Sequence, residues 1–232
     1  MTGEIEIIYQ DEYFLAVNKP NNVLVHHSHY ARNILDDSLL QLLKKQTGDQ
    51  YYPINRLDRK TSGVILLSNS KENVSDFQNL FDQKQINKVY HALVRGHVAE
   101  SQTIDSPVKN DRGNYKEALS EVTPIQHYTI DIPVKPYPTS RYTLLEMQPI
   151  TGRTHQLRIH ANKIAHPIIG DHKYGNRHHN RMFEEKLELP NLFLHCKETS
   201  FVHPFSKEHI SLTAEFPDFW NICFQQFEQF KV

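Results

Sequence analysis

Short apolar runs bounded by turn residues recur along the chain and predict β-strands. In residues 88–94, Val89 and Leu93 fall on one face and Tyr90 and Ala92 on the other, the two-residue period of a strand. The predicted strands span residues 5–8, 13–17, 64–67, 88–94, 118–125, 142–147, 192–195 and 209–214. Between two of them, residues 132–138 are rich in proline and predict a loop insertion.

Four stretches have apolar residues at helical spacing instead. The first follows the polar cap at residues 36–38 and the second follows the polar cap at residues 68–70. The third spans residues 154–165, with Thr154 as its cap and Pro167 after its end, and the fourth is an aromatic helix over residues 219–230. Strands and helices in this order, without an internal repeat or linker, predict one α+β domain over residues 1–232 with a mixed, mostly antiparallel sheet and flanking helices.

Composition narrows the class of protein. The chain has 232 residues and a net charge of −1, and no window is apolar for long enough to cross a membrane. The N-terminus lacks a signal-peptide pattern, and the two cysteines, Cys196 and Cys223, are far apart and suit a reducing compartment as small buried hydrophobes. We therefore expect a cytoplasmic protein.

The charge is unevenly distributed along the chain. Residues 141–181 contain seven Lys or Arg against two acids, together with six histidines and Tyr174. A basic stretch is usually a solvated face, but cations interleaved with aromatic residues are also typical of a nucleic-acid surface. Both interpretations stay open on charge alone.

One polar loop stands out, because it places an acid among cations next to an apolar strand. Residues 55–63 read N-R-L-D-R-K-T-S-G, so Asp58 lies among Arg56, Arg59 and Lys60. Nearby positive charges favour the ionised carboxylate, which suits a nucleophile or an electrostatic base better than a general acid. Alone, Asp58 is more typical of a structural ion pair in a turn.

Two other segments contain residues suited to an active site. Tyr90 is an aromatic polar residue on a strand, and residues 151–160 read T-G-R-T-H-Q-L-R-I-H at a helix start. His155 and Arg158 are three apart and share a face, which places Arg158 to pair with a buried acid. Each has a plain structural alternative, packing for Tyr90 and a solvated face for the arginines, but the three patterns together favour a site.

These motifs together resemble the RluA-type pseudouridine synthases. The matching segments are R-L-D-R-K-T-S-G at 56–63, K-V-Y-H-A-L-V-R-G at 88–96, T-G-R-T-H-Q-L-R-I-H at 151–160 and H-P-I-I-G-D at 166–171, with V-N-K-P at 17–20, L-F-L-H at 192–195 and F-V-H-P at 201–204. The resemblance extends over nearly the whole length. It implies the pseudouridine synthase catalytic fold, with a central cleft, and an isomerase that needs no metal, nucleotide or redox cofactor.

The resemblance also implies roles for particular residues. Asp58 would be the essential carboxylate, with its chemical step left open, Arg158 would hold it ionised, and Tyr90 would stack on the uracil. Arg56 would help to flip the target uridine, and Leu157 or Ile159 would pack near the base. The candidate phosphate contacts are Arg153, Lys173 and Arg177.

The proline-broken insertion is most similar to the TruC branch, which modifies tRNA. That likeness implies tRNA as the partner, with position 65 as the target, although the residues themselves fix neither the RNA nor the uridine, and ribosomal RNA remains an alternative. We expect a monomer with no obligate protein partner and no membrane association, without the S4 RNA-binding domain of some relatives. One residue departs from the family: Asn55 stands where histidine is usual, and we interpret that position as structural.

Two rival classes remain. A non-catalytic RNA-binding protein would keep the basic face but has no need of Asp58, Tyr90 and Arg158 together. A metal hydrolase is suggested by 15 histidines, but His155 and His160 are five apart and lack the His-Glu-x-x-His arrangement. The pair His178-His179 is expected to point opposite ways on a strand, and the loop cluster His26, His27 and His29 to bind metal only adventitiously.

Overall fold

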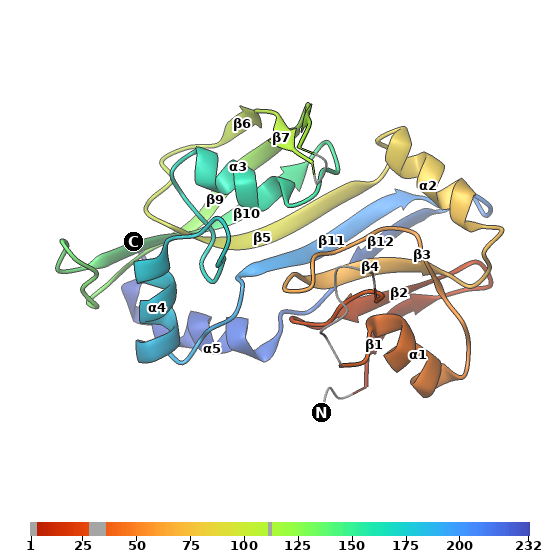
Figure 1. The fold of residues 1–232 in the computed structure, drawn as a ribbon, viewed down its shortest axis with the longest axis horizontal. Helices are drawn as coiled ribbons and strands as arrows, with labels where there is room; N and C mark the ends of the chain where they lie inside the picture. Colours follow the sequence, from red (N-terminus) through yellow and green to blue (C-terminus); the bar gives the residue numbers. More distant parts are fainter. Residues whose placement is uncertain (1–3, 28–35, 111–112) are drawn as a thin grey trace. The chain divides into compact units, whose positions relative to one another are not determined.

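The structure is a computed structural model that describes residues 4–27, 36–110 and 113–232. The chain forms two compact units, each built from two separate segments (Figure 1). Unit 1 consists of Met1–Lys88 and Cys196–Glu215, and unit 2 of Val89–His195 and Phe216–Val232. That all 232 residues act as one catalytic domain remains a prediction.

Unit 1 is built on antiparallel strand pairs. Strand β2 pairs with β1 on one side and β4 on the other, β3 extends β4, and β12 pairs with β11. Their bounds are β1 (Glu6–Gln10), β2 (Phe14–Lys19), β3 (Tyr52–Pro53), β4 (Ser62–Ser68), β11 (Leu194–Val202) and β12 (His209–Thr213). Every residue of β4 is buried, as its continuous apolar run predicts.

Two helices, α1 (Leu39–Thr47) and α2 (Val74–Asp82), complete unit 1. Ser38 and Gln41 form a capping box at the start of α1, which confirms the polar cap predicted at residues 36–38, and Gly48 ends the helix in the left-handed conformation. The predicted cap of α2 is wrong, because the N-cap is Asn73 and Ser68 still belongs to β4. The α2 side chain Phe77 is fully buried and meets the rings of Phe14 and Phe201.

Unit 2 contains a second antiparallel group of strands, in the order β5-β10-β9-β6. Their bounds are β5 (Asn87–Arg95), β6 (Gln102–Asp105), β9 (Leu119–Ile130) and β10 (Ser140–Pro149), with the separate pair β7 (Val108–Lys109) and β8 (Tyr115–Lys116). Strands β9 and β10 enclose the predicted insertion. The mostly antiparallel α+β fold is therefore confirmed, although the sequence did not predict the short strands β3, β6, β7 and β8.

The helices of unit 2 differ from the predictions in two places. Helix α3 (Gln156–Lys163) begins later than expected, and its N-cap is His155 in a left-handed conformation, so the prediction of Thr154 as the cap is wrong. Residues 177–186 form helix α4 (Arg177–Lys186), so His178 and His179 lie on a helix, not on a strand. The sequence missed α4 because most of its residues are polar.

An aromatic core holds unit 2 together. Helix α5 (Asp218–Phe227) contributes Trp220 and Phe227, and the short turn η2 (Glu228–Phe230) follows it. Tyr142 of β10 is fully buried and meets the Phe183 and Phe227 rings at centroid distances of 5.2 and 5.7 Å. Its hydroxyl lies 2.8 Å from Nδ1 of His179, which explains why that histidine is buried.

Both cysteines are buried and unbridged, as predicted. Burial raises the pKa of the Cys223 thiol to about 12, so it stays protonated and behaves as a small hydrophobe. No helix within the described ranges is long and apolar enough to cross a membrane.

Candidate active site

The Asp58 loop of unit 1 connects β3 to β4. The Ile54 amide donates to the Leu66 carbonyl at 3.0 Å, and the Leu66 amide donates to the Asn55 side-chain oxygen at 2.9 Å. Asn55 therefore anchors the start of the loop to β4, which supports a structural role for this departure from the family. Three residues later Asp58 is half-buried, and β4 begins at Ser62.

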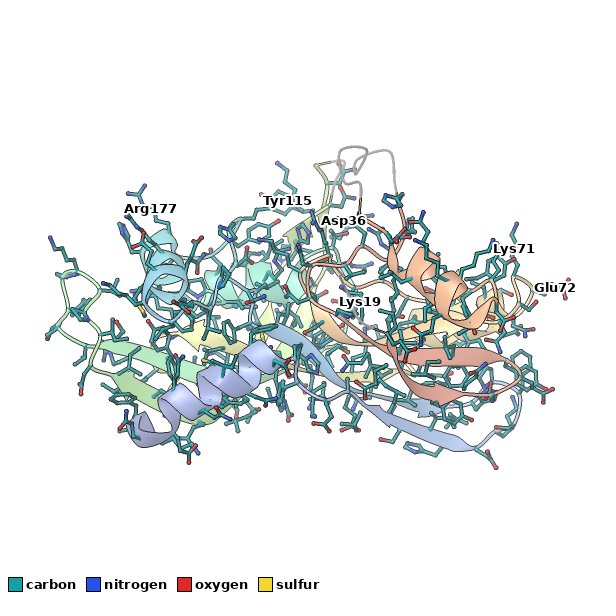
Figure 2. The ribbon with its side chains drawn as sticks, turned by 90° about the horizontal axis from the view of Figure 1, so that it is seen from below. Lys19, Asp36, Lys71, Glu72, Tyr115 and Arg177 are labelled. Carbon is teal, nitrogen blue, oxygen red and sulfur yellow. The ribbon has the colours of Figure 1, made fainter. Side chains whose placement is uncertain are left out.

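A buried lysine supports this loop from inside unit 1. Lys19, at the end of β2, has no exposed surface (Figure 2). Its ammonium donates to the carbonyl oxygens of Pro20, Val23 and Arg59 at 2.8, 2.8 and 3.0 Å. Three acceptors match the three N–H donors of an ammonium, so this otherwise costly buried cation is well satisfied.

Further bonds join the loop after Lys19 to the loop that carries Asp58. The Asn21 side chain donates to the Lys60 carbonyl, and the Arg59 Nε donates to the Asn22 carbonyl at 3.1 Å. The Thr61 amide closes a turn onto the Asp58 carbonyl at 3.1 Å. These hydrogen bonds hold the main chain around Asp58 in place.

The charge of Lys19 is sensitive to this environment. Burial lowers the pKa of the Lys19 ammonium to about 7, against an opposing effect of the Asp58 carboxylate, and the Arg59 guanidinium lowers it further. Lys19 is therefore a further cation that acts on Asp58 within unit 1, besides Arg56, Arg59 and Lys60, which the sequence indicated. The sequence indicated Lys19 only as part of the V-N-K-P family match, because a lysine at the end of a strand is normally solvated.

Gly63 fixes the other end of the loop. A Cβ at this position would lie 2.2 Å from the Cys196 carbonyl oxygen, and its φ of +109° is unfavourable for any residue with a side chain. Only glycine permits β4 to approach Cys196 of β11 this closely. The glycine of the R-L-D-R-K-T-S-G motif thus has a packing reason.

In unit 2, Tyr90 lies near the start of β5 and pairs in register with Met147 of β10. Its side chain is 9% exposed. Such burial is typical of a packing residue and equally suits a ring that lines a site. The structure fixes its strand position and leaves its role as a prediction.

Arg158 of α3 forms an ion pair with Asp171. The arginine Nε donates to Asp171 Oδ2 at 2.7 Å and its Nη2 donates to Oδ1 at 2.8 Å, the two-pronged geometry that guanidinium and carboxylate prefer. The side chains are 11% and 1% exposed. The sequence placed Arg158 to pair with a buried acid, and within unit 2 that acid is Asp171.

The Asp171 carboxylate is itself held by the backbone. The amides of Lys173 and Tyr174 donate to its Oδ1 at 2.9 and 3.0 Å. Burial acts to raise the pKa of the Asp171 carboxyl, but the Arg158 guanidinium and these two amides outweigh it and hold the pKa below its ordinary value. Asp171 is therefore ionised at neutral pH.

The chain just before Asp171 lies along β5. The Ile169 amide donates to the Leu93 carbonyl at 2.9 Å, and the Arg95 amide donates to the Pro167 carbonyl at 3.0 Å. At Gly170, with a φ of +77°, a Cβ would lie 1.8 Å from the Asn191 carbonyl oxygen. Close packing thus sets where the Asp171 loop begins.

Tyr174 packs on the same arginine. The Arg158 guanidinium carbon lies 5.2 Å from the centre of the Tyr174 ring, and the Lys173 ammonium lies at the same distance, both within range of a cation–π interaction. The Tyr174 hydroxyl lies 3.0 Å from Nδ1 of His155. The sequence singled out Tyr174 only as one aromatic residue of a basic stretch.

The remaining predicted residues divide between surface and core. Arg56, Arg153, Lys173 and Arg177 are exposed, as phosphate or RNA contacts need to be, and Figure 2 shows Arg177 on α4. The Arg153 Nε donates to the Glu117 carbonyl at 3.1 Å. Leu157 is buried, whereas its alternative Ile159 is partly exposed.

Within each unit the predicted residues group differently. Arg56 and Asp58 belong to unit 1, and the other predicted site residues belong to unit 2. Unit 2 brings Arg158 and Lys173 together on the Tyr174 ring. The pairing of Arg158 with Asp58 and the stacking role of Tyr90 remain predictions.

For a metal centre, residues 4–27, 36–110 and 113–232 offer no group of three or more His, Cys, Asp or Glu that could hold an ion. His29, the third histidine of the predicted loop cluster, lies outside the described residues. His160 is buried between the Ser120 hydroxyl and the Ser106 carbonyl, at 3.0 and 2.9 Å. That histidine joins α3 to the strands of unit 2.

The class of protein follows from comparing the whole sequence with known families. The family of RNA pseudouridylate synthases matches residues 13–163. Because the match covers more than half of the chain, the protein belongs to that family. The predicted family and fold are confirmed.

More specific likeness comes from three bacterial relatives, each named tRNA pseudouridine synthase C. The Vibrio vulnificus protein is 38% identical over 97% of this chain and 96% of its own length. The Yersinia pestis protein is 39% identical over 96% and 91%, and the Haemophilus influenzae protein 37% over 96% and 98%.

Two solved structures share the fold. Human RNA Pseudouridylate Synthase Domain Containing 4 has a TM-score of 0.73 and 23% identity, with 96% of this chain and 93% of that chain covered. Human RNA Pseudouridylate Synthase Domain Containing 1 has a TM-score of 0.71 and 23% identity, over 92% and 84%.

Proposed function

We propose that this protein isomerises a uridine of tRNA to pseudouridine, at the position that the TruC branch modifies. It acts in the cytoplasm, as a monomer and without a cofactor. The single observation that carries the proposal is the Asp58 loop, a family motif whose carboxylate sits on a backbone fixed by Lys19, Asn21 and Gly63. The relatives named tRNA pseudouridine synthase C support tRNA as the substrate class.

Asp58 is the essential carboxylate in this proposal. The reaction breaks the bond between ribose C1′ and uracil N1, turns the base and forms a bond from C1′ to C5, after which the C5 proton leaves and N1 is protonated. No electrons are gained or lost, so no redox partner is required. Asp58 must be ionised for each route open to it, and the adjacent cations Lys19 and Arg59, together with Arg158, supply positive charge for that purpose.

Other residues hold the flipped nucleotide. Tyr90 stacks on the uracil and assists proton removal from C5, and Leu157 or Ile159 packs against the base. Arg56 is exposed and fills the gap that the extruded uridine leaves, which lowers the unstacking cost of a few kcal/mol.

The exposed basic side chains of unit 2 contact the RNA backbone. Arg153, Lys173 and Arg177 supply charge from the α3 and α4 region. Tyr115 of β8, labelled in Figure 2, is 69% exposed. The Lys109 ammonium lies 5.9 Å from the centre of its ring. An exposed ring beside cations is suited to stacking on unpaired bases.

Release of tritium from tRNA labelled at uracil C5 tests the proposal directly, because only bond formation at C5 frees that atom. We expect release that needs no added metal and persists in a chelator. Binding of tRNA without release would identify a non-catalytic RNA-binding protein. Pseudouridine mapping in total RNA from cells with and without the gene separates tRNA from ribosomal RNA, and a change confined to ribosomal RNA would overturn the tRNA assignment.

A further inference from the structure

The Arg158 guanidinium is restrained on one edge and on its face. Asp171 takes the edge made by Nε and Nη2, and the Tyr174 ring lies 5.2 Å from the guanidinium carbon. We infer that Asp171 is a positioning residue that, with Tyr174, keeps Arg158 directed to the catalytic carboxylate and prevents it from binding an RNA phosphate instead. This inference rests on the proposed function, in which Arg158 serves Asp58.

The competition arises from the substrate. RNA carries one phosphate per nucleotide, and the Nε–Nη2 edge of a guanidinium fits phosphate as well as it fits carboxylate. Lys173 and Arg153 are exposed and attract phosphates to the same part of unit 2. An arginine there without a bound carboxylate would be captured by the RNA backbone, so its ion pair has a purpose beyond stability.

Asp171 is suited to this task because it cannot easily turn away. Its carboxylate accepts the amides of Lys173 and Tyr174, and its own carbonyl accepts the Gly175 amide at 2.9 Å and the Asn180 side chain at 2.8 Å. It is 1% exposed, so an approaching phosphate has no open path to replace it.

Tyr174 is also held in place, by three polar contacts. Its amide bonds to Asp171, its carbonyl accepts from the Asn162 side chain at 2.7 Å, and its hydroxyl lies 3.0 Å from His155 Nδ1. The ring therefore covers Arg158 in one orientation. Through this hydroxyl His155, which is the N-cap of α3, joins the helix start to the Asp171 loop.

The test is Asp171→Asn, assayed by tritium release and by tRNA binding over a range of salt concentrations. Asparagine keeps one oxygen for the two amides but places N–H donors against the guanidinium, which releases Arg158. We expect kcat to fall about 30-fold while the Kd for tRNA stays unchanged or falls, with a steeper salt dependence. A raised KM with unchanged kcat would overturn the inference, because that pattern means that the residue contributes only to substrate binding.

The matched control is Glu185→Gln, which breaks the exposed ion pair with Arg181, also 2.7 Å long and also in unit 2. It should leave kcat and the salt dependence within about twofold. Thermal unfolding reports whether Asp171→Asn folds. If it does not, Tyr174→Leu removes the ring without touching the Asp171 bonds and should lower kcat about fivefold at constant Kd, and an unchanged kcat would overturn the inference.

A double-mutant cycle separates positioning from general damage. In the Arg158→Met background, Asp171→Asn should lower kcat by less than about twofold more, because the residue it positions is gone. Losses that simply multiply would refute the inference. If the wild-type protein releases no tritium from tRNA, the proposed function fails; if it does and the losses multiply, the inference alone fails.

Discussion

In both units a buried charged side chain holds a predicted site residue in place, but the sign of the buried charge differs between the Asp58 loop of unit 1 and the Arg158 site of unit 2. In unit 1 a buried cation, Lys19, bonds three main-chain carbonyls and thereby fixes the loop that carries an acid. In unit 2 a buried anion, Asp171, accepts hydrogen bonds from main-chain amides and also forms an ion pair with the Arg158 guanidinium. The first device fixes a backbone, and the second fixes a functional group directly.

This difference indicates how substitutions should affect each site. In unit 1 the hydrogen bonds from Lys19 and Asn21 hold the main chain next to Asp58, whereas in unit 2 the Arg158 side chain itself has lost most of its torsional freedom before substrate arrives. An arginine carries about 2 kcal/mol of rotamer entropy, which folding has already removed here. Substitutions in unit 1 should therefore affect the loop as a whole, and those in unit 2 a single guanidinium.

The largest effect is expected for Asp58→Asn, which removes the charge and keeps the shape. Pseudouridine formation should fall below detection, at least 1,000-fold, since no other residue replaces an essential carboxylate. Tritium release from tRNA measures it, with thermal unfolding and tRNA binding as controls that should stay near wild type. Substantial turnover by this variant would remove Asp58 from the mechanism.

Arg158→Met should come next, with a loss of activity of about 100-fold. Methionine retains much of the apolar stem but no donor, so the positive charge proposed to serve Asp58 is lost. Arg158→Lys keeps a charge without the two-pronged geometry and should recover only part of the rate. A wild-type rate for Arg158→Met would show that the acid of unit 1 needs no help from unit 2.

Gly63→Ala tests the backbone side of the comparison. The added Cβ meets the Cys196 carbonyl in a left-handed conformation, so the free energy of unfolding should fall by about 3 kcal/mol or more. Gly48→Ala is the control, because its φ is also positive but nothing lies within 4 Å, and it should cost only about 1 kcal/mol. Equal losses in thermal unfolding would mean that close packing at Gly63 is unimportant.

The buried lysine gives a pH-dependent prediction. Its folded pKa of about 7 is below the unfolded value of 10.5, so the folded chain binds fewer protons between these values and becomes more stable as pH rises. Relative to Lys19→Met, the wild type should gain roughly 1 kcal/mol in unfolding free energy per pH unit across this window. Denaturant titrations at pH 7, 8 and 9 measure it, and a constant difference would contradict the prediction.

The smallest effects are expected at the exposed cations. Lys173→Gln or Arg177→Gln should each weaken tRNA binding a few-fold and reduce the salt slope by about one, with kcat unchanged. Lys71→Gln, at an exposed lysine of unit 1 (Figure 2), is the comparison and should change neither. A loss at Lys71 equal to that at Lys173 would show that the basic stretch of unit 2 has no special part in RNA binding.

Local signals in the sequence predicted much of the fold. The polar cap at residues 36–38 and the apolar run of β4 depend only on neighbouring residues, and the structure confirms both. Helix α4 was missed because its apolar side chains Met182 and Phe183 are too few to set a period, although Asn176 before it is a good cap. The late start of α3 reflects the Gln156 side chain, which bonds the Arg153 amide and occupies the first turn.

Local sequence patterns predicted only part of the candidate site as well. The family motifs supplied Asp58, Tyr90 and Arg158, but their supporting residues come from distant positions in the chain. Lys19 reaches Arg59 across 40 residues, and Asp171 reaches Arg158 around the end of a helix and a loop. Pairings of this kind depend on tertiary structure, which no local pattern encodes.

The discontinuous make-up of the two units has a consequence for biosynthesis. Unit 1 includes Cys196–Glu215, which follows the long segment Val89–His195 of unit 2, and unit 2 in turn includes Phe216–Val232. A nascent chain on the ribosome therefore lacks the strand that packs on Gly63 until Val89–His195 of unit 2 has been synthesised. Each unit can therefore be completed only after a segment of the other unit has been translated.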